Sequence, residues 1–280
     1  MGACIFRGGR YDLDMLIGMR TIAGACVVTG VLVCLDLGAT TNQAIRVALY
    51  DDAGATGKGI PRVMELLAGA RGIGVVSLKA GDFRPNSLRG YDVVMFTGGS
   101  GSKQAGALGD AGREEVRRFV REGGGYVGIC AGAYLACAGF SWGVGVLDAK
   151  TVSPKWRRGK GTVNIEMLPR GAAITGLKAG PHDIRYANGP IITGLGRDDI
   201  PDFEPLAVFR SELAENGSPP GAMTGSPAMS CGHYGKGRVF VSSPHPEQTA
   251  GMERLVENVV RWAAVGAGDH RSSQRMALPR

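Results

Sequence analysis

A cysteine and a histidine, 115 residues apart, lie in two fragments that could do chemistry together. Cys130 lies in the run YVGICAGAY, in which a short apolar strand precedes the cysteine and Gly128 and Gly132 flank it. This pattern is typical of a nucleophile elbow, a strained strand-to-helix turn where a neighbouring side chain would clash. His245 lies in the run SPHPE, with Glu247 two residues later. A cysteine nucleophile needs an imidazole base and a carboxylate that orients it, so the two fragments predict a Cys130–His245–Glu247 triad.

A third fragment, TGGSG at residues 97–101, follows another apolar strand. Ligands of α/β sheets bind beyond the carboxyl ends of the strands, so this turn is expected to lie near the cysteine and the histidine. Its backbone amides could then form an oxyanion hole together with the amide that follows the cysteine, and removal of one such donor typically costs about 100- to 1000-fold in rate. The expected donors and substrate-binding groups of this kind are Gly98, Gly99, Ser100 and Ala131.

Each fragment alone is weak evidence, because Gly-x-Cys-x-Gly is often a structural turn and His-Pro-Glu occurs by chance. Their conjunction, in order and each at a strand end, favours a triad. An imidazole beside a cysteine at the start of a helix also favours the reactive thiolate. The remaining histidines, His182, His233 and His270, lack such a context. Histidines and cysteines show no metal-ligand spacing, so we expect no metal and no cofactor.

Composition is that of a globular protein with 46 glycines and a net charge of +7. The basic residues are scattered except in residues 155–160, and no nucleic-acid motif accompanies them, so a nucleic-acid partner is not expected. Residues 155–160 are interpreted as a solvated loop, with contact to an acidic ligand as the alternative.

Residues 1–39 are interpreted as a secretory signal peptide or an N-terminal membrane anchor. Arg20 precedes residues 21–35, which carry no charge, and Leu37-Gly38-Ala39 resembles a cleavage site. The apolar stretch is shorter than the roughly 20 residues of a membrane span, which favours cleavage and export to the periplasm or the extracellular space. The alternatives are an uncleaved anchor, a lipid on Cys34, and a cytoplasmic protein that starts at Met15 or Met19.

Removal of residues 1–39 leaves three of the six cysteines, Cys130, Cys137 and Cys231. This odd number excludes a complete disulfide framework. Cys137 is interpreted as a small buried hydrophobic residue, and a bridge to Cys231 is the alternative.

Short apolar strands alternate with helices in the first half of the chain, which implies a mostly parallel sheet covered on both faces. The expected strands there are residues 45–50, 74–78, 92–96 and 126–129, and the expected helices are residues 60–70 and 110–122. The second half is rich in strands, expected at residues 146–152, 162–167, 184–186, 206–209, 228–231 and 238–242. A helix is expected at residues 252–264 and a disordered tail at residues 266–280.

These motifs resemble the class I glutamine amidotransferase-like superfamily, through GICAG, TGGSG and SPHPE. Within it the chain is most similar to the biotin–protein ligase N-terminal (BPL_N) domain family, through VALYDDAGA, CAGAYLA and residues 186–190 (YANGP). The resemblance covers residues 44–264 as one domain. It implies an α/β fold with a three-layer, mostly parallel, doubly wound (flavodoxin-like) sheet and a strand-rich C-terminal half.

One residue departs from the pattern of the superfamily. Glutaminases of this class usually carry glutamine four places after the nucleophile, and Tyr134 occupies that position here. The sequence also shows no synthetase domain that would use ammonia, so we do not expect free glutamine as the substrate. Tyr134, Asn188 and residues 155–160 are the expected determinants of specificity.

The leading hypothesis is a cysteine-dependent hydrolase or acyl transferase that acts on an amide-type bond of a small molecule or a peptide. The alternative is a non-catalytic binding or regulatory domain that keeps the fold and the pocket. A third interpretation, the intracellular-peptidase branch of the superfamily, is disfavoured because that branch commonly has histidine directly after the nucleophile and this chain has Ala131.

Overall fold

The computed structural model describes residues 44–266, which lie within one compact unit. The expected signal peptide or anchor and all but the first residue of the expected tail lie outside the described residues. Within residues 44–266, no helix has both the length and the apolar character that a membrane span requires.

A nine-stranded sheet forms the centre of the fold, in the order β2-β1-β3-β4-β11-β10-β9-β6-β7. Its first five strands pair in parallel. They are β2 (Ile73–Leu78), β1 (Ile45–Tyr50), β3 (Val93–Phe96), β4 (Gly125–Ile129) and β11 (Gly237–Ser242). Taken in chain order, this is the 2-1-3-4-5 arrangement of flavodoxin-like sheets, which confirms the expected fold class.

The last four strands pair in antiparallel fashion and form the strand-rich half. They are β10 (Pro227–Tyr234), β9 (Glu204–Phe209), β6 (Lys160–Met167) and β7 (Gly180–Ala187). Two short strands, β5 (Ala149–Thr151) and β8 (Ile192–Gly194), form a separate antiparallel pair; β5 precedes β6 in the chain, and β8 connects β7 to β9.

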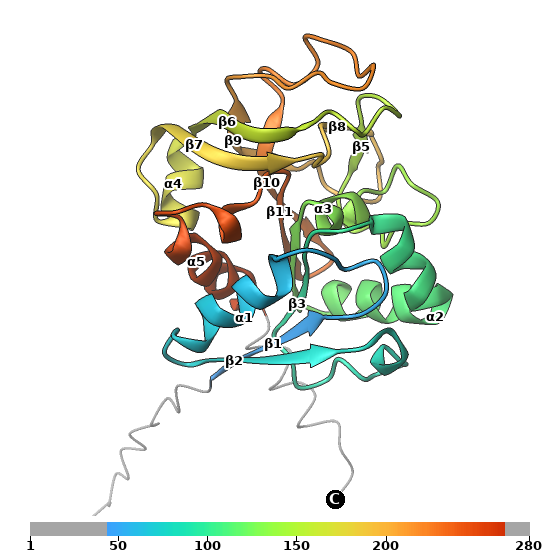
Figure 1. The fold of residues 1–280 in the computed structure, drawn as a ribbon. Coiled ribbons are helices and arrows are strands. Elements are labelled where there is room, and N and C mark those ends of the chain that lie inside the picture. Colours follow the sequence, from blue (N-terminus) through green and yellow to red (C-terminus); the bar gives the residue numbers. More distant parts are fainter. Residues whose placement is uncertain (1–43, 267–280) are drawn as a thin grey trace, which may run out of the picture. The chain divides into compact units, whose positions relative to one another are not determined.

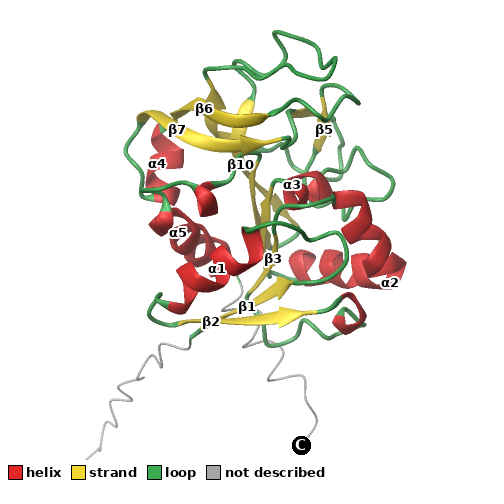
Figure 2. Ribbon diagram, in the orientation of Figure 1, coloured by secondary structure: helices red, strands yellow, loops and turns green. Residues whose placement is uncertain are grey.

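Helices cover both faces of the parallel strands, as Figures 1 and 2 show. One face carries α1 (Gly59–Ala68) and α5 (Glu253–Ala264), and the other carries α2 (Gly101–Arg121) and α3 (Ala131–Ala136). Helix α4 (Pro169–Thr175) packs against α5 and against β9 of the antiparallel half. Two single-turn 3-10 helices, η1 (Ala80–Asp82) and η2 (Pro246–Gln248), complete the described elements.

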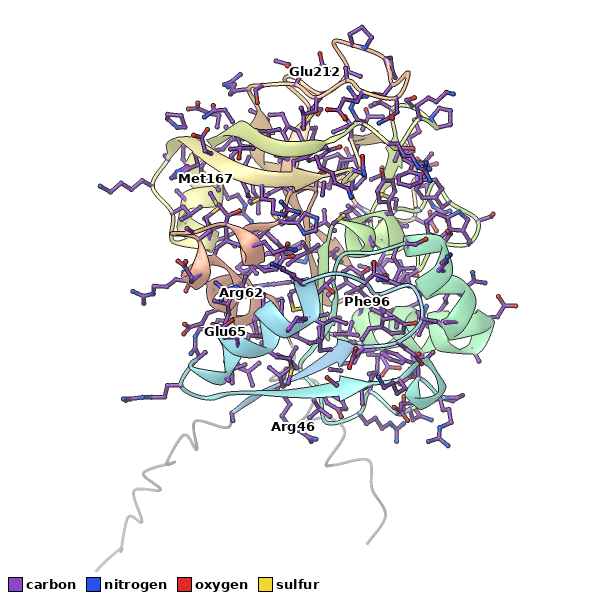
Figure 3. The ribbon with its side chains drawn as sticks, in the orientation of Figure 1. Arg46, Arg62, Glu65, Phe96, Met167 and Glu212 are labelled. Atoms are coloured by element: carbon purple, nitrogen blue, oxygen red, sulfur yellow. The ribbon has the colours of Figure 1, made fainter. Side chains whose placement is uncertain are left out.

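Alternation along β1 divides its buried side chains between these two faces. Val47 and Leu49 belong to the apolar cluster under α1 and α5, whereas Ala48 and Tyr50 belong to the cluster under α2 and α3. Phe96 at the end of β3 (Figure 3) stacks on the Tyr50 ring with centroids 5.3 Å apart. Apolar packing on both faces thus fixes the strand ends from which the candidate site is built.

Several predicted boundaries were wrong. Helix α2 begins at Gly101 rather than at residue 110, because Ser100 caps it and accepts a hydrogen bond from the Lys103 amide at 3.4 Å. Its first turns contain glycines that lower helix propensity, and its backbone breaks at Gly109, where φ is 62°. Of the strand expected at residues 146–152, only Ala149–Thr151 forms one, and α4 and β8 were not predicted.

Candidate functional site

Cys130 occupies a strained turn between β4 and α3. Its φ is +53° and its ψ is −99°, a backbone conformation that non-glycine residues rarely adopt. The flanking glycines allow the turn: a Cβ on Gly128 would lie 2.6 Å from the Gly132 carbonyl oxygen, and one on Gly132 would lie 2.3 Å from that of Phe96. The Cys130 amide donates to the Ser242 carbonyl at 2.8 Å, so the turn is fixed to the end of β11.

β11 leads directly to His245 and, through η2, to Glu247. The turn at Pro246 brings the carboxylate back, and His245 Nδ1 donates to Glu247 Oε1 at 2.8 Å. Both side chains are buried, with residue exposures of 5% and 1%. Since Nδ1 is bound to Glu247, Nε2 is the ring nitrogen left for Cys130.

The electrostatic surroundings favour the imidazolium form of His245. Burial lowers the pKa of the imidazole, but hydrogen bonds and charge interactions with Cys130 and Glu247 outweigh burial and raise the pKa to about 10. His245 is therefore the histidine of the site whose pKa is strongly raised, with Cys130 and Glu247 as its partners.

The turn at residues 97–101 has two distinct parts. The Ser100 amide donates to the Gly54 carbonyl at 2.8 Å and so is not available to a ligand. The amides of Gly99 and Ala131 donate to no other group within residues 44–266. Gly99 has a φ of +135°, and a Cβ there would lie 2.0 Å from the Gly54 carbonyl oxygen, so the close approach of the two loops requires glycine.

Gly98 lies against the histidine ring. A Cβ on Gly98 would lie 3.0 Å from His245 Cε1. The structure therefore brings the turn and the histidine together, although they come from different strands.

Tyr134 and Asn188 meet beside the cysteine. The Tyr134 hydroxyl donates to the Asn188 carbonyl at 3.2 Å, and burial raises the pKa of Tyr134. Asn188 has a φ of +58°, and its Oδ1 accepts from the Gly159 amide at 2.8 Å. Its side-chain oxygen thus connects β7 to the start of β6, while the preceding Ala187 carbonyl accepts from Cys130 Sγ at 3.5 Å.

These residues open onto a cleft of about 1460 Å³. Its lining includes the predicted Cys130 and His245, and also Gly98, Gly99, Ser100, Tyr134 and Asn188. Glu247 lies behind His245, and the Ala131 side chain is buried.

Two residues at the site were not predicted from the sequence. Gln248 Nε2 donates to Glu247 Oε1 at 2.8 Å and lies 3.2 Å from His245 Nδ1. Arg62 of α1 (Figure 3) donates from Nε to the Glu247 carbonyl at 3.4 Å. The position of Gln248 directly after Glu247 is the signal that could have indicated it; nothing in the sequence around Arg62 does so.

The other cysteines in the described part of the chain lie apart from this chemistry. Cys137 and Cys231 are buried and unpaired, so the alternative of a bridge between them is not adopted. Burial raises the pKa of Cys137 to about 12 and is also the main cause of the raised pKa of Cys231. Within residues 44–266, no three His, Cys, Asp or Glu side chains are grouped so that they could hold a metal ion.

A family model matches the first half of the described chain. The family model for the N-terminal part of biotin-protein ligase matches residues 46–155, which is less than half of the sequence. An uncharacterized protein of Chlamydia muridarum is 42% identical over 50 residues, which are 18% of this chain and only 19% of that protein.

Structural comparisons cover most of the described residues. A glutamine amidotransferase superposes with a TM-score of 0.53 and 19% identity, over 77% of this chain and 99% of that one. A ThuA-like protein from Parabacteroides merdae gives a TM-score of 0.52 and 16% identity, over 80% of this chain and 91% of that one. A ThuA-like protein from Bacteroides uniformis gives a TM-score of 0.53 and 16% identity, over 79% of this chain and 91% of that one.

Identities this low establish the fold and not the activity. The chain has a glutamine amidotransferase-like fold and is similar over residues 46–155 to the biotin–protein ligase N-terminal domain family.

Proposed function

We propose that the protein is a cysteine-dependent hydrolase or acyl transferase that acts on an amide-type bond. Cys130 is the nucleophile, His245 the proton carrier and Glu247 the residue that orients His245. The observation that carries the proposal is a convergence at one cleft. It joins a cysteine on a strained turn, an imidazole–carboxylate pair at 2.8 Å, and two backbone amides that have no acceptor within residues 44–266.

The proposed reaction has two stages. Cys130 Sγ attacks the carbonyl carbon of the substrate, and the thiol proton passes to His245 Nε2. The amides of Gly99 and Ala131 stabilise the negative charge that develops on the carbonyl oxygen. The C–N bond then breaks, and the leaving amine takes the proton from His245.

The thioester that remains on Cys130 reacts with water or with an acceptor amine. His245 takes a proton from this second nucleophile and returns one to the sulfur as the C–S bond breaks. Throughout, the hydrogen bond to Glu247 holds His245 in the tautomer with a proton on Nδ1.

A binding or regulatory domain is the second candidate function, and one observation favours it. Cys130 Sγ donates to the Ala187 carbonyl at 3.5 Å, which engages the thiol form of the side chain. Tyr134, which replaces the glutamine usual in glutaminases, also contacts this segment through Asn188. A pocket of this kind could bind an amide without cleaving it.

Thiol reactivity separates the two functions without a known substrate. We expect iodoacetamide at pH 7 to modify Cys130 at least 100-fold faster than Cys137 or Cys231, roughly the gain expected from an activated thiolate. Mass spectrometry of the three cysteine peptides gives the rates within one sample. Equal rates at the three buried sites would contradict the proposal, as would amidase turnover that survives in a Cys130→Ala variant.

A further inference from the structure

The walls of the cleft carry an excess of positive charge. Five basic side chains line it, against two acidic ones, Glu215 and Glu253. Of the basic ones, only Arg62 forms an ion pair within residues 44–266, with Glu65 at 2.6 Å. The other four are Lys58, Arg157, Lys160 and Arg185. Unpaired cations around a cleft with low-dielectric walls raise the local concentration of anions.

A buried arginine lies next to this charged wall. Arg158 is 2% exposed, and its Nη2 donates at 3.0 Å to Glu212 Oε1 and at 3.0 Å to the Pro219 carbonyl. Glu212, labelled in Figure 3, lies in the loop between β9 and β10. The Nε and Nη1 atoms of Arg158 have no acceptor within the described residues. A buried donor without a partner costs about 1–3 kcal/mol, so such donors call for an explanation.

Arg158 borders a small cavity that adjoins the cleft. Tyr134, Thr151, Ser153 and Trp156 line both spaces, so one wall separates them. The small cavity measures about 10 Å³, which is about the size of one water or one oxygen atom. The cavity has room for a single water, and Arg158 does not itself line the cleft.

The cleft also has aromatic surfaces and considerable size. Phe140 and Trp142 stack with centroids 4.5 Å apart, and Tyr134 lies 6.2 Å from Phe140. Trp156 is half exposed, with Arg157 over its ring. The volume of about 1460 Å³ exceeds the roughly 300–1000 Å³ of ordinary small-molecule sites. The cleft is therefore larger than a single amino acid requires.

We infer that the ligand of this cleft is a carboxylate-bearing amide larger than one amino acid, with a carboxylate recognised by Arg157 and Lys160, which line the cleft. The identity of the bond that reacts rests on the proposed function. Recognition of the carboxylates does not, because it depends on binding alone.

The first experiment measures binding to the full chain with the Cys130→Ala substitution, which carries no nucleophile at this position. Calorimetry compares triglutamate with triglutamine, which has the same length and no side-chain charge, and with free glutamate. We expect triglutamate to bind at least tenfold more tightly than either, with an affinity that falls as salt rises. Equal binding of triglutamate and triglutamine would overturn the inference of carboxylate recognition. Equal binding of triglutamate and free glutamate would overturn the inference that the ligand is larger than one amino acid.

The second experiment uses Cys130 as a reporter of the local field. Iodoacetate and iodoacetamide are similar in size and differ in charge, so the ratio of their rates at Cys130, divided by the ratio for glutathione, measures anion attraction. We expect this normalised ratio of rates to be at least 10 in the unmodified protein. Removal of one cation should lower the ratio about threefold, the effect of a unit charge about 7 Å away in water. The variants are Arg157→Gln and Lys160→Gln.

Arg89→Gln is the matched control, because Arg89 is exposed and precedes the amino end of β3, whereas Cys130 follows the carboxyl end of the neighbouring strand β4. A normalised ratio near 1, or an equal fall in Arg89→Gln, would contradict the inference. Inorganic phosphate decides the ligand class on the Cys130→Ala chain, since phosphate binding tighter than glutarate binding would overturn recognition of a carboxylate.

Discussion

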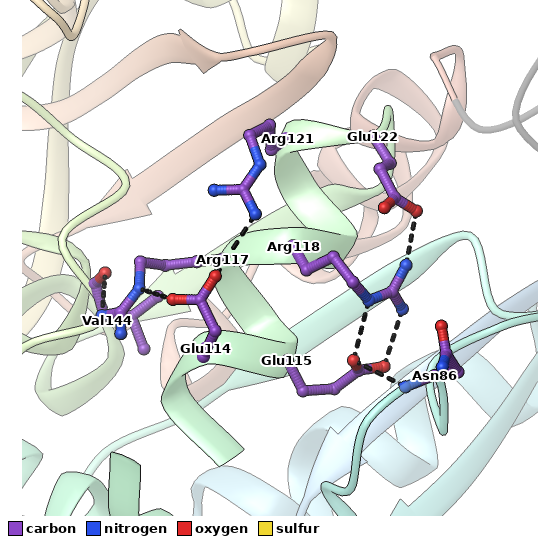
Figure 4. A network of polar contacts seen from close by, with 8 residues as sticks. All are labelled: Asn86, Glu114, Glu115, Arg117, Arg118, Arg121, Glu122 and Val144. Atoms are coloured by element: carbon purple, nitrogen blue, oxygen red, sulfur yellow. Dashed lines mark hydrogen bonds and ion pairs between the residues drawn. The ribbon is translucent and has the colours of Figure 1, made fainter. Parts of the chain in front are cut away.

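Two buried glutamates illustrate the difference between the helical side of the molecule and the cleft. Glu115 on α2 is 2% exposed and Glu247 is 1% exposed. Glu115 accepts four hydrogen bonds, from the amides of Asn86 and Leu88 and from Nε and Nη2 of Arg118; Figure 4 shows those from Asn86 and Arg118. Glu247 accepts both of its side-chain bonds at Oε1, from His245 and Gln248, and its Oε2 has no partner within the described residues.

Two arginines repeat the contrast. All three guanidinium nitrogens of Arg118 donate to Glu115 or Glu122 (Figure 4). Arg158 is more deeply buried and uses one nitrogen. Burial therefore does not distinguish these two networks, whereas the completeness of their hydrogen bonds does. The network around Glu115 and Arg118 stabilises the fold, whereas Glu247 and Arg158 keep buried polar atoms without partners within the described residues.

The strongest test of the contrast between Glu115 and Glu247 is the same substitution, Glu→Gln, at both positions. Glu247→Gln should slow Cys130 alkylation at pH 7 by about 100- to 10,000-fold, because the amide cannot hold the imidazolium. It should also lower the free energy of unfolding, but by less than Glu115→Gln does, because Glu247 accepts two side-chain hydrogen bonds and Glu115 accepts four. Glu115→Gln should lower the free energy of unfolding by about 2 kcal/mol, the typical value of a charged buried hydrogen bond. Urea unfolding and mass-spectrometric alkylation rates check both arms, and the comparison fails if Glu247→Gln is the more destabilising change.

Gly98→Ala tests how tightly the turn holds the histidine. The new methyl would lie 3.0 Å from His245 Cε1, so the ring must shift by a few tenths of an ångström. We expect a loss of up to about 100-fold in alkylation rate, since small displacements of catalytic groups are costly. Gly106→Ala on α2, where a Cβ meets nothing within 4 Å, is the control. An unchanged rate in Gly98→Ala would show that the ring position is not critical.

The pH dependence of stability should report the charge of His245. Its folded pKa, about 10, lies above the usual value of 6.5, so the stabilisation from the imidazolium is complete below pH 6.5 and is lost as pH rises towards 10. Urea unfolding at pH 6, 8 and 9.5 should show a larger decline in the unmodified protein than in His245→Gln. His233→Gln, at an exposed position on β10, is the control. Parallel curves for the unmodified protein and His245→Gln would refute the assignment.

Tyr134→Phe should have the smallest effect. It removes the 3.2 Å hydrogen bond to the Asn188 carbonyl, worth about 1 kcal/mol, and leaves the ring in contact with Phe140. Urea unfolding should show a decrease of that size, and the alkylation rate of Cys130 should change less than threefold. A larger change in rate would mean that the hydroxyl acts on the cysteine and not only on the loop.

The sequence patterns located the parallel strands well, because those strands are apolar and are bounded by glycine and charged residues. β1 was predicted at its observed bounds, Ile45–Tyr50. Helix α4 was missed because it has seven residues, too few for helical periodicity, and begins at Pro169. β8 has three residues, and its pairing with β5 depends on tertiary structure.

Within the site, proximity and the pairing of His245 with Glu247 could be predicted, but the other polar partners could not. Carboxyl ends of parallel strands meet at one edge, which is why Cys130, His245 and the turn at residues 97–101 were expected together. The bond of Asn188 Oδ1 to the Gly159 amide joins residues 29 positions apart and follows no local pattern. The same holds for the bond of Arg158 to Glu212, 54 positions away. Residues 155–160 were expected as a solvated loop, yet Arg158 is buried and Arg157 and Lys160 line the cleft.

The nine-stranded sheet has a practical consequence for protein engineering. Cys130 and His245 follow β4 and β11, strands of the parallel half, whereas Lys160 and Asn188 belong to the β6–β7 hairpin region of the antiparallel half. Grafts that exchange the β5–β6 connection would alter one wall of the cleft and leave in place the β7–β8 connection, where Gly189 packs against Ser243 after β11. Ligand preference could thus be selected from loop libraries while the reactive centre stays constant.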